Sequence, residues 1–145
     1  MIGMEVKTLL KDIFAKIHQS AEALDADFTT SNIKSLKKEL KVIRSFMSFV
    51  RSNNSDKNFH MPDKVKKVYI TLGAICEWLE ENPGKDTDDN PLWVNIFNVA
   101  KGEWERNYSP AIFKKFEAYL IDYHYGKIHP DVFRNFLSLK DKAEM

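Results

Sequence analysis

The residues with the clearest chemical character in this chain are five cations within the stretch from Ile33 to Val50. If this stretch is helical, with about 100° of rotation per residue, the five side chains share an arc roughly 120° wide. Like charges on one helix face repel each other in the folded state, so the pattern favours an anionic partner. The five residues are Lys34, Lys37, Lys38, Lys41 and Arg44.

Three further lysines open the next predicted helix. They can line a facing wall if this helix and the preceding one form an antiparallel hairpin. Of these, Lys64 and Lys67 join the candidate polyanion-binding residues, and Lys66 lies between them. Their position opposes the helix dipole, which favours negative rather than positive charge at a helix N-terminus. We therefore expect them to contribute less than the cations of the first stretch.

The elements that must position these residues are predicted to be helices. Apolar residues recur at spacings of three and four along most of the chain, and no convincing alternating strand is present. We expect one all-α domain, residues 1–145, built as a compact bundle of five to six helices joined mostly by short loops. Thr29, Thr30 or Ser31 can cap the second helix, and Asp63 can cap the third. The predicted helices are Glu5 to Leu24, a second that follows a cap at Thr29, Thr30 or Ser31 and continues to Ser52, Lys64 to Glu81, Pro91 to Arg106, Pro110 to Tyr125 and a shorter one opening at His129-Pro130.

Charge is unevenly distributed along the chain. The sequence has 145 residues and a net charge of +1, which by itself indicates no partner. Between Ser31 and Ile70, however, ten Lys and Arg residues stand against three Asp and Glu. Such asymmetry is typical of a surface with an anionic ligand. We expect no membrane partner, because no apolar run approaches the length of a membrane span, and we find no signal-peptide pattern. The single cysteine, Cys76, favours a reducing, cytoplasmic setting.

The basic stretch resembles the opening of the CHAD family, helical domains named for their conserved histidines. That family has a pattern of the form V-H-x-L-R-x-x-I-(K/R)-R-L-R-x-L-x-x-L-F, and this chain reads IKSLKKELKVIRSFMSFV from position 33. A later LGAICE segment, from Leu72, is similar to the family's L-G-x-x-R-D. The chain differs from the family at three positions, where Lys34, Val42 and Cys76 replace a histidine and two arginines. The resemblance implies a short CHAD-like half whose basic groove binds inorganic polyphosphate or a similar polyanion, without catalysis or cofactor.

Other residues that could carry chemistry have simpler interpretations. His124 and His129 lack a carboxylate at ligand spacing, so we expect no metal site. The acidic turn around Asp86 to Asn90 lacks the glycine and the distal glutamate of a calcium loop. Cys76 has no histidine near it in the sequence, and we expect a buried structural thiol. No phosphate-binding glycine loop or catalytic motif is present, and we expect no enzyme.

Two alternatives to polyanion binding stay open at this stage. The cations can face solvent or an acidic protein, which would make the chain a helical protein-interaction module. Nucleic acid ranks third, because no recognised DNA-reading module is visible. The second half of the chain is rich in aromatic residues, which form either core or a patch that mates with a second copy in a homodimer.

Overall fold

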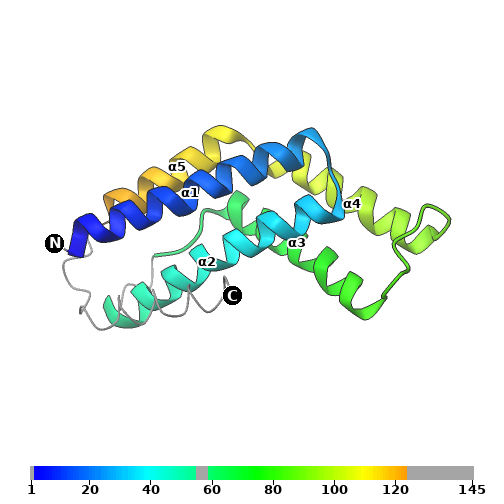
Figure 1. The fold of residues 1–145 in the computed structure, drawn as a ribbon, viewed down its shortest axis with the longest axis horizontal. Helices are drawn as coiled ribbons and strands as arrows, with labels where there is room; N and C mark the ends of the chain where they lie inside the picture. Colours follow the sequence, from blue (N-terminus) through cyan, green and yellow to red (C-terminus); the bar gives the residue numbers. More distant parts are fainter. Residues whose placement is uncertain (1, 55–58, 124–145) are drawn as a thin grey trace.

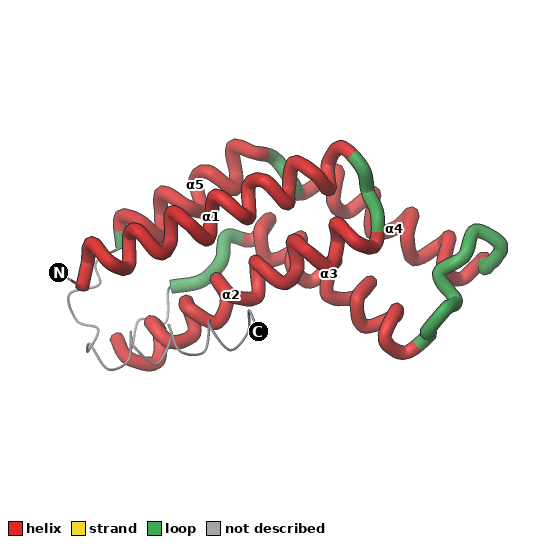
Figure 2. Tube along the Cα trace, in the orientation of Figure 1, coloured by secondary structure: helices red, strands yellow, loops and turns green. Residues whose placement is uncertain are grey.

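A computed structural model describes residues 2–54 and 59–123 of the chain. Every regular element in this part is a helix, which confirms the all-α prediction (Figure 2). The predicted helix at His129-Pro130 and the predicted cap at Gly126 lie outside the described residues. The helices are α1 (Ile2–Ala26), α2 (Thr30–Asn54), α3 (Asp63–Glu81), α4 (Pro91–Asn107) and α5 (Pro110–Asp122).

Four of these helices close a ring around the core. α1 packs on α2 and α5, and α3 packs on α2 and α5 from the other side. α1 and α5 run side by side in Figure 1, with α2 and α3 along the opposite edge. α4 lies outside this ring and packs on α3. Because apolar stripes from α1, α2, α3 and α5 all face inward, the four form a bundle with one shared interior.

The apolar stripe predicted for the basic stretch is fully buried. Ile33, Leu36, Leu40 and Ile43 have no exposed surface, and Met47 and Val50 are almost as deeply buried. The cations are placed differently. Residues that alternate with a buried stripe must lie at the border of that stripe or on the exposed side of the helix. The hydrophobic pattern therefore places the charged side chains of α2 on the surface.

Helix starts follow local capping chemistry, with one correction. Thr29 accepts a hydrogen bond from the backbone of Asn32 at 3.2 Å, and Ser109 accepts one from Ile112 at 3.1 Å. The prediction that Asp63 caps α3 is wrong. Pro62 occupies the cap position without a side-chain hydrogen bond, and Asp63 is the first helical residue. A proline there fixes an extended entry to the helix, and Asp63 instead adds negative charge to the first turn.

The aromatic residues mostly pack against one another. Trp104 stacks on Tyr108 at 4.2 Å between ring centroids, and Trp78 stacks on Trp93 at 5.3 Å. Trp104 also donates a hydrogen bond to Asp25 at 3.1 Å, which fastens the end of α4 to the end of α1. These contacts favour the core interpretation of the aromatic group over a broad exposed patch.

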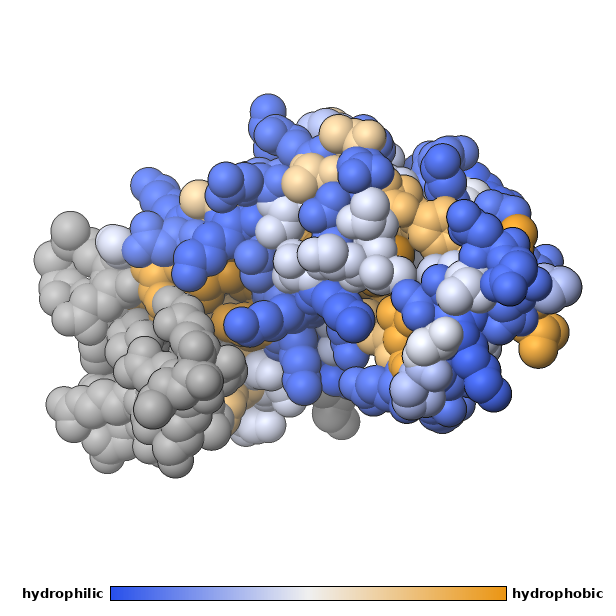
Figure 3. All heavy atoms as spheres, turned by 45° about the vertical axis from the view of Figure 1, so that its right-hand side comes forward, coloured by the Kyte–Doolittle hydropathy of each residue, from blue (hydrophilic) through white to orange (hydrophobic). Residues whose placement is uncertain are grey.

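Hydrophilic residues cover most of the face seen in Figure 3, with small hydrophobic patches between them. Two large apolar side chains on α4, Leu92 and Val99, are 69% and 58% exposed. None of the helices in the described part of the chain is long and apolar enough to cross a membrane.

Candidate anion-binding sites between α2 and α3

α2 and α3 pack against each other as an antiparallel pair (Figure 1), the condition on which the predicted facing wall of lysines depended. Three contacts run along their seam in opposite sequence order. A Cβ built on Gly73 would lie 3.9 Å from Cε of Lys37, so the lysine stem crosses α3 where α3 has no side chain. Farther along, Arg44 lies over the ring of Tyr69, and Arg51 meets His60. The seam therefore carries cations along its whole length.

The first part of the seam is a groove lined by four of the five predicted cations, which we call the lysine groove. It holds about 440 Å³. Leu79, Cys76 and Glu80 form the α3 wall, so the groove contains four ammonium groups and one carboxylate. The lysines occupy successive turns of one helix, where neighbouring side chains lie about 5–6 Å apart. They are Lys34, Lys37, Lys38 and Lys41.

The lysines of this groove affect the pKa of the Cys76 thiol. Cys76 is 7% exposed, as expected for a buried structural cysteine. Burial raises the pKa of its thiol, Lys37 and Lys34 act against that rise, and Glu80 adds to it. The thiol is therefore a weak nucleophile whose reactivity depends on the charge state of the groove.

The remaining predicted site residues lie elsewhere. Lys64 and Lys67 are exposed on α3 and line neither the lysine groove nor the neighbouring pocket, so the structure does not bring them together with the cations of α2. At 100° per residue, Lys66 lies on the side of α3 that carries Tyr69 and Gly73 and faces α2, whereas Lys64 and Lys67 lie on other sides. Lys66, between them, does reach the seam.

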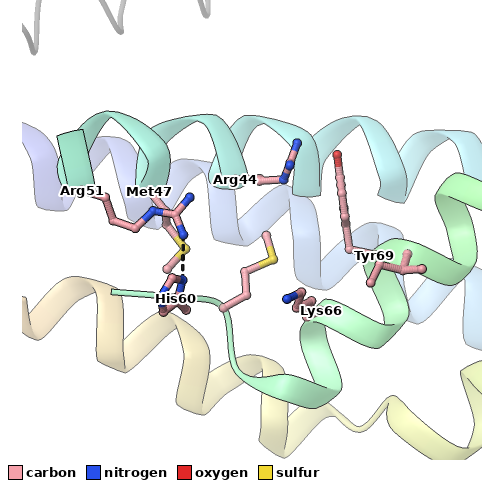
Figure 4. Close-up of a pocket in the computed structure, with 8 residues that line it drawn as sticks. Arg44, Met47, Arg51, His60, Lys66 and Tyr69 are labelled. Carbon is pink, nitrogen blue, oxygen red and sulfur yellow. Dashed lines mark hydrogen bonds between the residues drawn. The ribbon is translucent and has the colours of Figure 1, made fainter. Parts of the chain in front are cut away.

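Arg44 belongs to a second hollow, which we call the arginine pocket. It holds about 290 Å³ between α2, the segment before α3 and α3 itself (Figure 4). The guanidinium carbon of Arg44 lies 5.6 Å from the ring centroid of Tyr69, within the range of a cation–π interaction. The pocket is lined by Arg44, Met47, Arg51, His60, Met61, Lys66, Tyr69 and Ile70.

A hydrogen bond joins Arg51 to His60 at one end of the pocket. The two nitrogen atoms, Nη1 of Arg51 and Nδ1 of His60, are 2.7 Å apart. A guanidinium group has only donors, so Nδ1 of His60 is the acceptor in this contact. Figure 4 shows the two side chains meeting across the pocket from α2 and from the segment before α3. The pair thus closes one end of the pocket.

Sequence reasoning missed most of the arginine pocket. Arg51 follows Arg44 by seven residues and so lies on the same helix face, a signal that was available. His60 comes from a polar loop without periodicity and offered none. Its position is set by the preceding Phe59, which is fully buried and packs on Tyr119 and Tyr123 at 5.6 and 4.1 Å between ring centroids.

The one acidic residue in the middle of the basic stretch lies on the other side of α2. Glu39 faces α1, where burial raises the pKa of its carboxyl group and Ser20, Lys16 and Lys38 act against the rise. Its Oε2 atom is buried without a hydrogen-bond partner. The carboxylate therefore lies on the α1 side of the helix, and among the groove lysines Lys38 interacts with it.

The described residues contain no candidate metal cluster. In residues 2–54 and 59–123, no three His, Cys, Asp or Glu side chains are grouped closely enough to hold a metal ion. His18 meets Glu117 at 3.2 Å between α1 and α5, a single pair that ties two helices of the ring. His124 and His129 lie outside the described residues.

Comparisons with protein-family models, with curated proteins and with solved structures give no match for this chain, so the CHAD resemblance stays a prediction.

Proposed function

We propose that this protein binds a polyanion, such as inorganic polyphosphate, along the lysine groove and performs no catalysis. The observation that carries the proposal is the convergence of Lys34, Lys37, Lys38 and Lys41 in one concave surface facing a single carboxylate, that of Glu80. Cations arrayed along one groove raise the local concentration of a counter-ion and offset their own repulsion when it binds.

The chemistry of lysine suits a ligand that repeats one charge. An ammonium group is a compact point charge on a long stem, with three donors that rotate freely. It can follow successive phosphates without demanding one geometry. The groove holds no aromatic side chain on which a base could stack, which favours a phosphate chain over single-stranded nucleic acid.

The test measures polyphosphate binding by titration calorimetry at several salt concentrations. For four lysines we expect the logarithm of the association constant to fall against log salt with a slope of about −3, because counter-ions are released. The double variant Lys37→Glu/Lys41→Glu should bind at least about a hundredfold more weakly, since each reversal replaces an attraction with a repulsion.

A matched control uses the two lysines that lie outside the groove. Lys64→Glu/Lys67→Glu makes the same change in net charge on exposed positions of α3. We expect its affinity to stay within about threefold of the wild type, because screening limits the reach of a surface charge to about 8–10 Å. Equal losses in the two double variants would show that binding follows net charge and not the groove.

The alternative function is a helical protein-interaction module without an anion ligand. Leu92 and Val99 on the outer side of α4 are the exposed apolar residues that would favour it. Absence of measurable polyphosphate binding by the wild type at low salt would reject the polyanion proposal and leave this alternative. Oligomeric state, measured by light scattering, then decides the homodimer hypothesis, because a monomeric mass at micromolar concentration contradicts it.

A further inference from the structure

We propose that the arginine pocket is a separate binding site for a small organic phosphate monoester with an apolar or aromatic body. This inference goes beyond the polyanion proposal, since it concerns other residues and holds or fails on its own measurements.

The charge of the pocket calls for an anion. Arg44, Arg51 and Lys66 all line it, and no Asp or Glu does. Across the described residues, none of the three forms an ion pair with a carboxylate. Three cations gathered in one hollow repel each other, and a dianionic phosphate monoester relieves that repulsion.

The geometry suits a single phosphate group more than a chain. Guanidinium groups are planar forks that bind phosphate oxygens through pairs of parallel hydrogen bonds. Arg51 is held at one end of the pocket by His60, and Arg44 is held over Tyr69. Two guanidinium groups, each held by a neighbouring side chain, and one ammonium group thus line the same pocket. Such a set costs less conformational entropy on binding than free lysines do.

The other half of the pocket is apolar, which selects the body of the ligand. Met47, Met61 and Ile70 line it, and Ile70 is 58% exposed in the free protein. Methionine side chains adapt to irregular shapes and make favourable contacts with aromatic rings. Inorganic phosphate would leave the exposed side chain of Ile70 uncovered, whereas an aryl or short alkyl group would bury part of it.

The experiment titrates phenyl phosphate, inorganic phosphate and phenol into the full chain and follows the amide resonances of α2 and α3 by NMR. We expect phenyl phosphate to bind at least about fivefold more tightly than inorganic phosphate, and phenol to bind too weakly to measure. Equal affinity for the two phosphates would overturn the assignment of an apolar body. Equal affinity for phenyl phosphate and phenol would overturn the anion site.

Variants locate the site. Arg51→Gln and Lys66→Gln should each weaken phenyl phosphate binding about tenfold, because each removes a charge-assisted hydrogen bond. Both positions lie on the surface of helices, and circular dichroism and urea unfolding check that each variant folds as the wild type does. Lys37→Gln, which makes the same charge change in the lysine groove, should keep the wild-type affinity within about twofold.

A last variant tests which of the two hollows bordered by Arg44 and Arg51 holds the ligand. Arg44 and Arg51 also line a neighbouring hollow of about 320 Å³ with the hydroxyl groups of Ser45, Ser48 and Ser52. Ser48→Ala should leave phenyl phosphate binding unchanged if the ligand occupies the arginine pocket. A loss with Ser48→Ala, together with no loss with Lys66→Gln, would place the ligand in the other hollow and overturn the proposal.

Discussion

The lysine groove and the arginine pocket lie on the same helix pair, yet they differ in almost every property that governs recognition. The groove presents four ammonium groups on long stems to one carboxylate, Glu80. The pocket presents two guanidinium groups and one ammonium group beside Tyr69 and an apolar floor. One surface can neutralise a repeated charge, and the other can orient a single group.

The difference comes from what α3 supplies opposite α2. Near Lys37, α3 contributes Gly73, so the lysine stem crosses α3 at a position without a side chain. Near Arg44, α3 contributes Tyr69, and the segment before it contributes His60 as a partner for Arg51. Cations at the same spacing on α2 therefore have free side chains in the lysine groove and oriented side chains in the arginine pocket, because contacts with partner residues limit side-chain freedom.

The largest expected effect comes from removing Phe59, which holds the segment of the arginine pocket that carries His60 and has no role in the lysine groove. Phe59→Ala should lower the free energy of unfolding by about 3–5 kcal/mol, measured in urea, because it leaves a cavity beside Tyr119 and Tyr123. Release of the segment that carries His60 should abolish phenyl phosphate binding while polyphosphate binding persists. Phe14→Ala, at a position equally buried in α1, should cost similar stability and spare both ligands. Loss of both ligands in Phe59→Ala alone would contradict the independence of the sites.

The thiol of Cys76 reports on the groove alone. Lys37 and Lys34 lower the pKa of this thiol, so a polyanion that neutralises them should raise it and also cover the groove wall. We expect saturating polyphosphate to slow alkylation by N-ethylmaleimide at pH 7 by about threefold or more. Phenyl phosphate should leave the rate unchanged. An unchanged rate with bound polyphosphate would place that ligand outside the groove, and complete labelling in urea serves as the control.

Removal of the carboxylate of Glu80 should strengthen ligand binding in the lysine groove and leave the arginine pocket unchanged. Glu80→Gln deletes the one acidic side chain that lines the groove and should raise polyphosphate affinity about two- to fivefold by calorimetry. Phenyl phosphate binding should not change. Glu77→Gln, one turn away and exposed on the same helix, makes the same charge change outside the lining. A similar gain with Glu77→Gln would indicate a general effect of net charge.

The smallest expected effect concerns a face of α2 that belongs to neither site. Burial raises the pKa of Glu39 above its ordinary 4.5, so the folded state holds this proton more tightly than the unfolded state does. Its contribution to stability is therefore most favourable at acid pH and becomes less favourable as the pH rises above about 4.5. Glu39→Gln should remove that loss and stabilise the protein at pH 7 by a few tenths of a kcal/mol, since solvent partly screens a carboxyl group that is not fully buried.

Urea unfolding of the wild type and Glu39→Gln at pH 4 and pH 7 checks this prediction. The difference between the two proteins should be larger at pH 7, and neither ligand should change its affinity. A larger difference at pH 4 would mean that the pKa of Glu39 is lowered in the folded state. A loss of polyphosphate affinity would mean that Glu39 acts on the groove.

Much of the fold could be predicted because the apolar spacing is regular. The stripe from Ile33 to Val50 specified both a helix and its buried side, and Ser109-Pro110 specified the start of α5. The same stripe placed four lysines on one surface. Asp63 was assigned the wrong role because a proline before a helix and an acidic residue at its start carry similar signals. Lys64 and Lys67 were grouped with Lys66, although only Lys66 lies on the side of α3 that carries Tyr69 and faces α2.

The sequence by itself determined that this chain forms helices, which side of each is buried, and that cations crowd one side of α2. Those properties are local, since each depends on residues within a few turns of one another. The tertiary structure alone decided which cations act together. It set Arg44 beside Tyr69, brought His60 to Arg51, and left Lys34 to Lys41 facing Glu80. These pairings depend on how the four-helix ring closes and on the burial of Phe59 against α5, and neither leaves a periodic trace in the sequence.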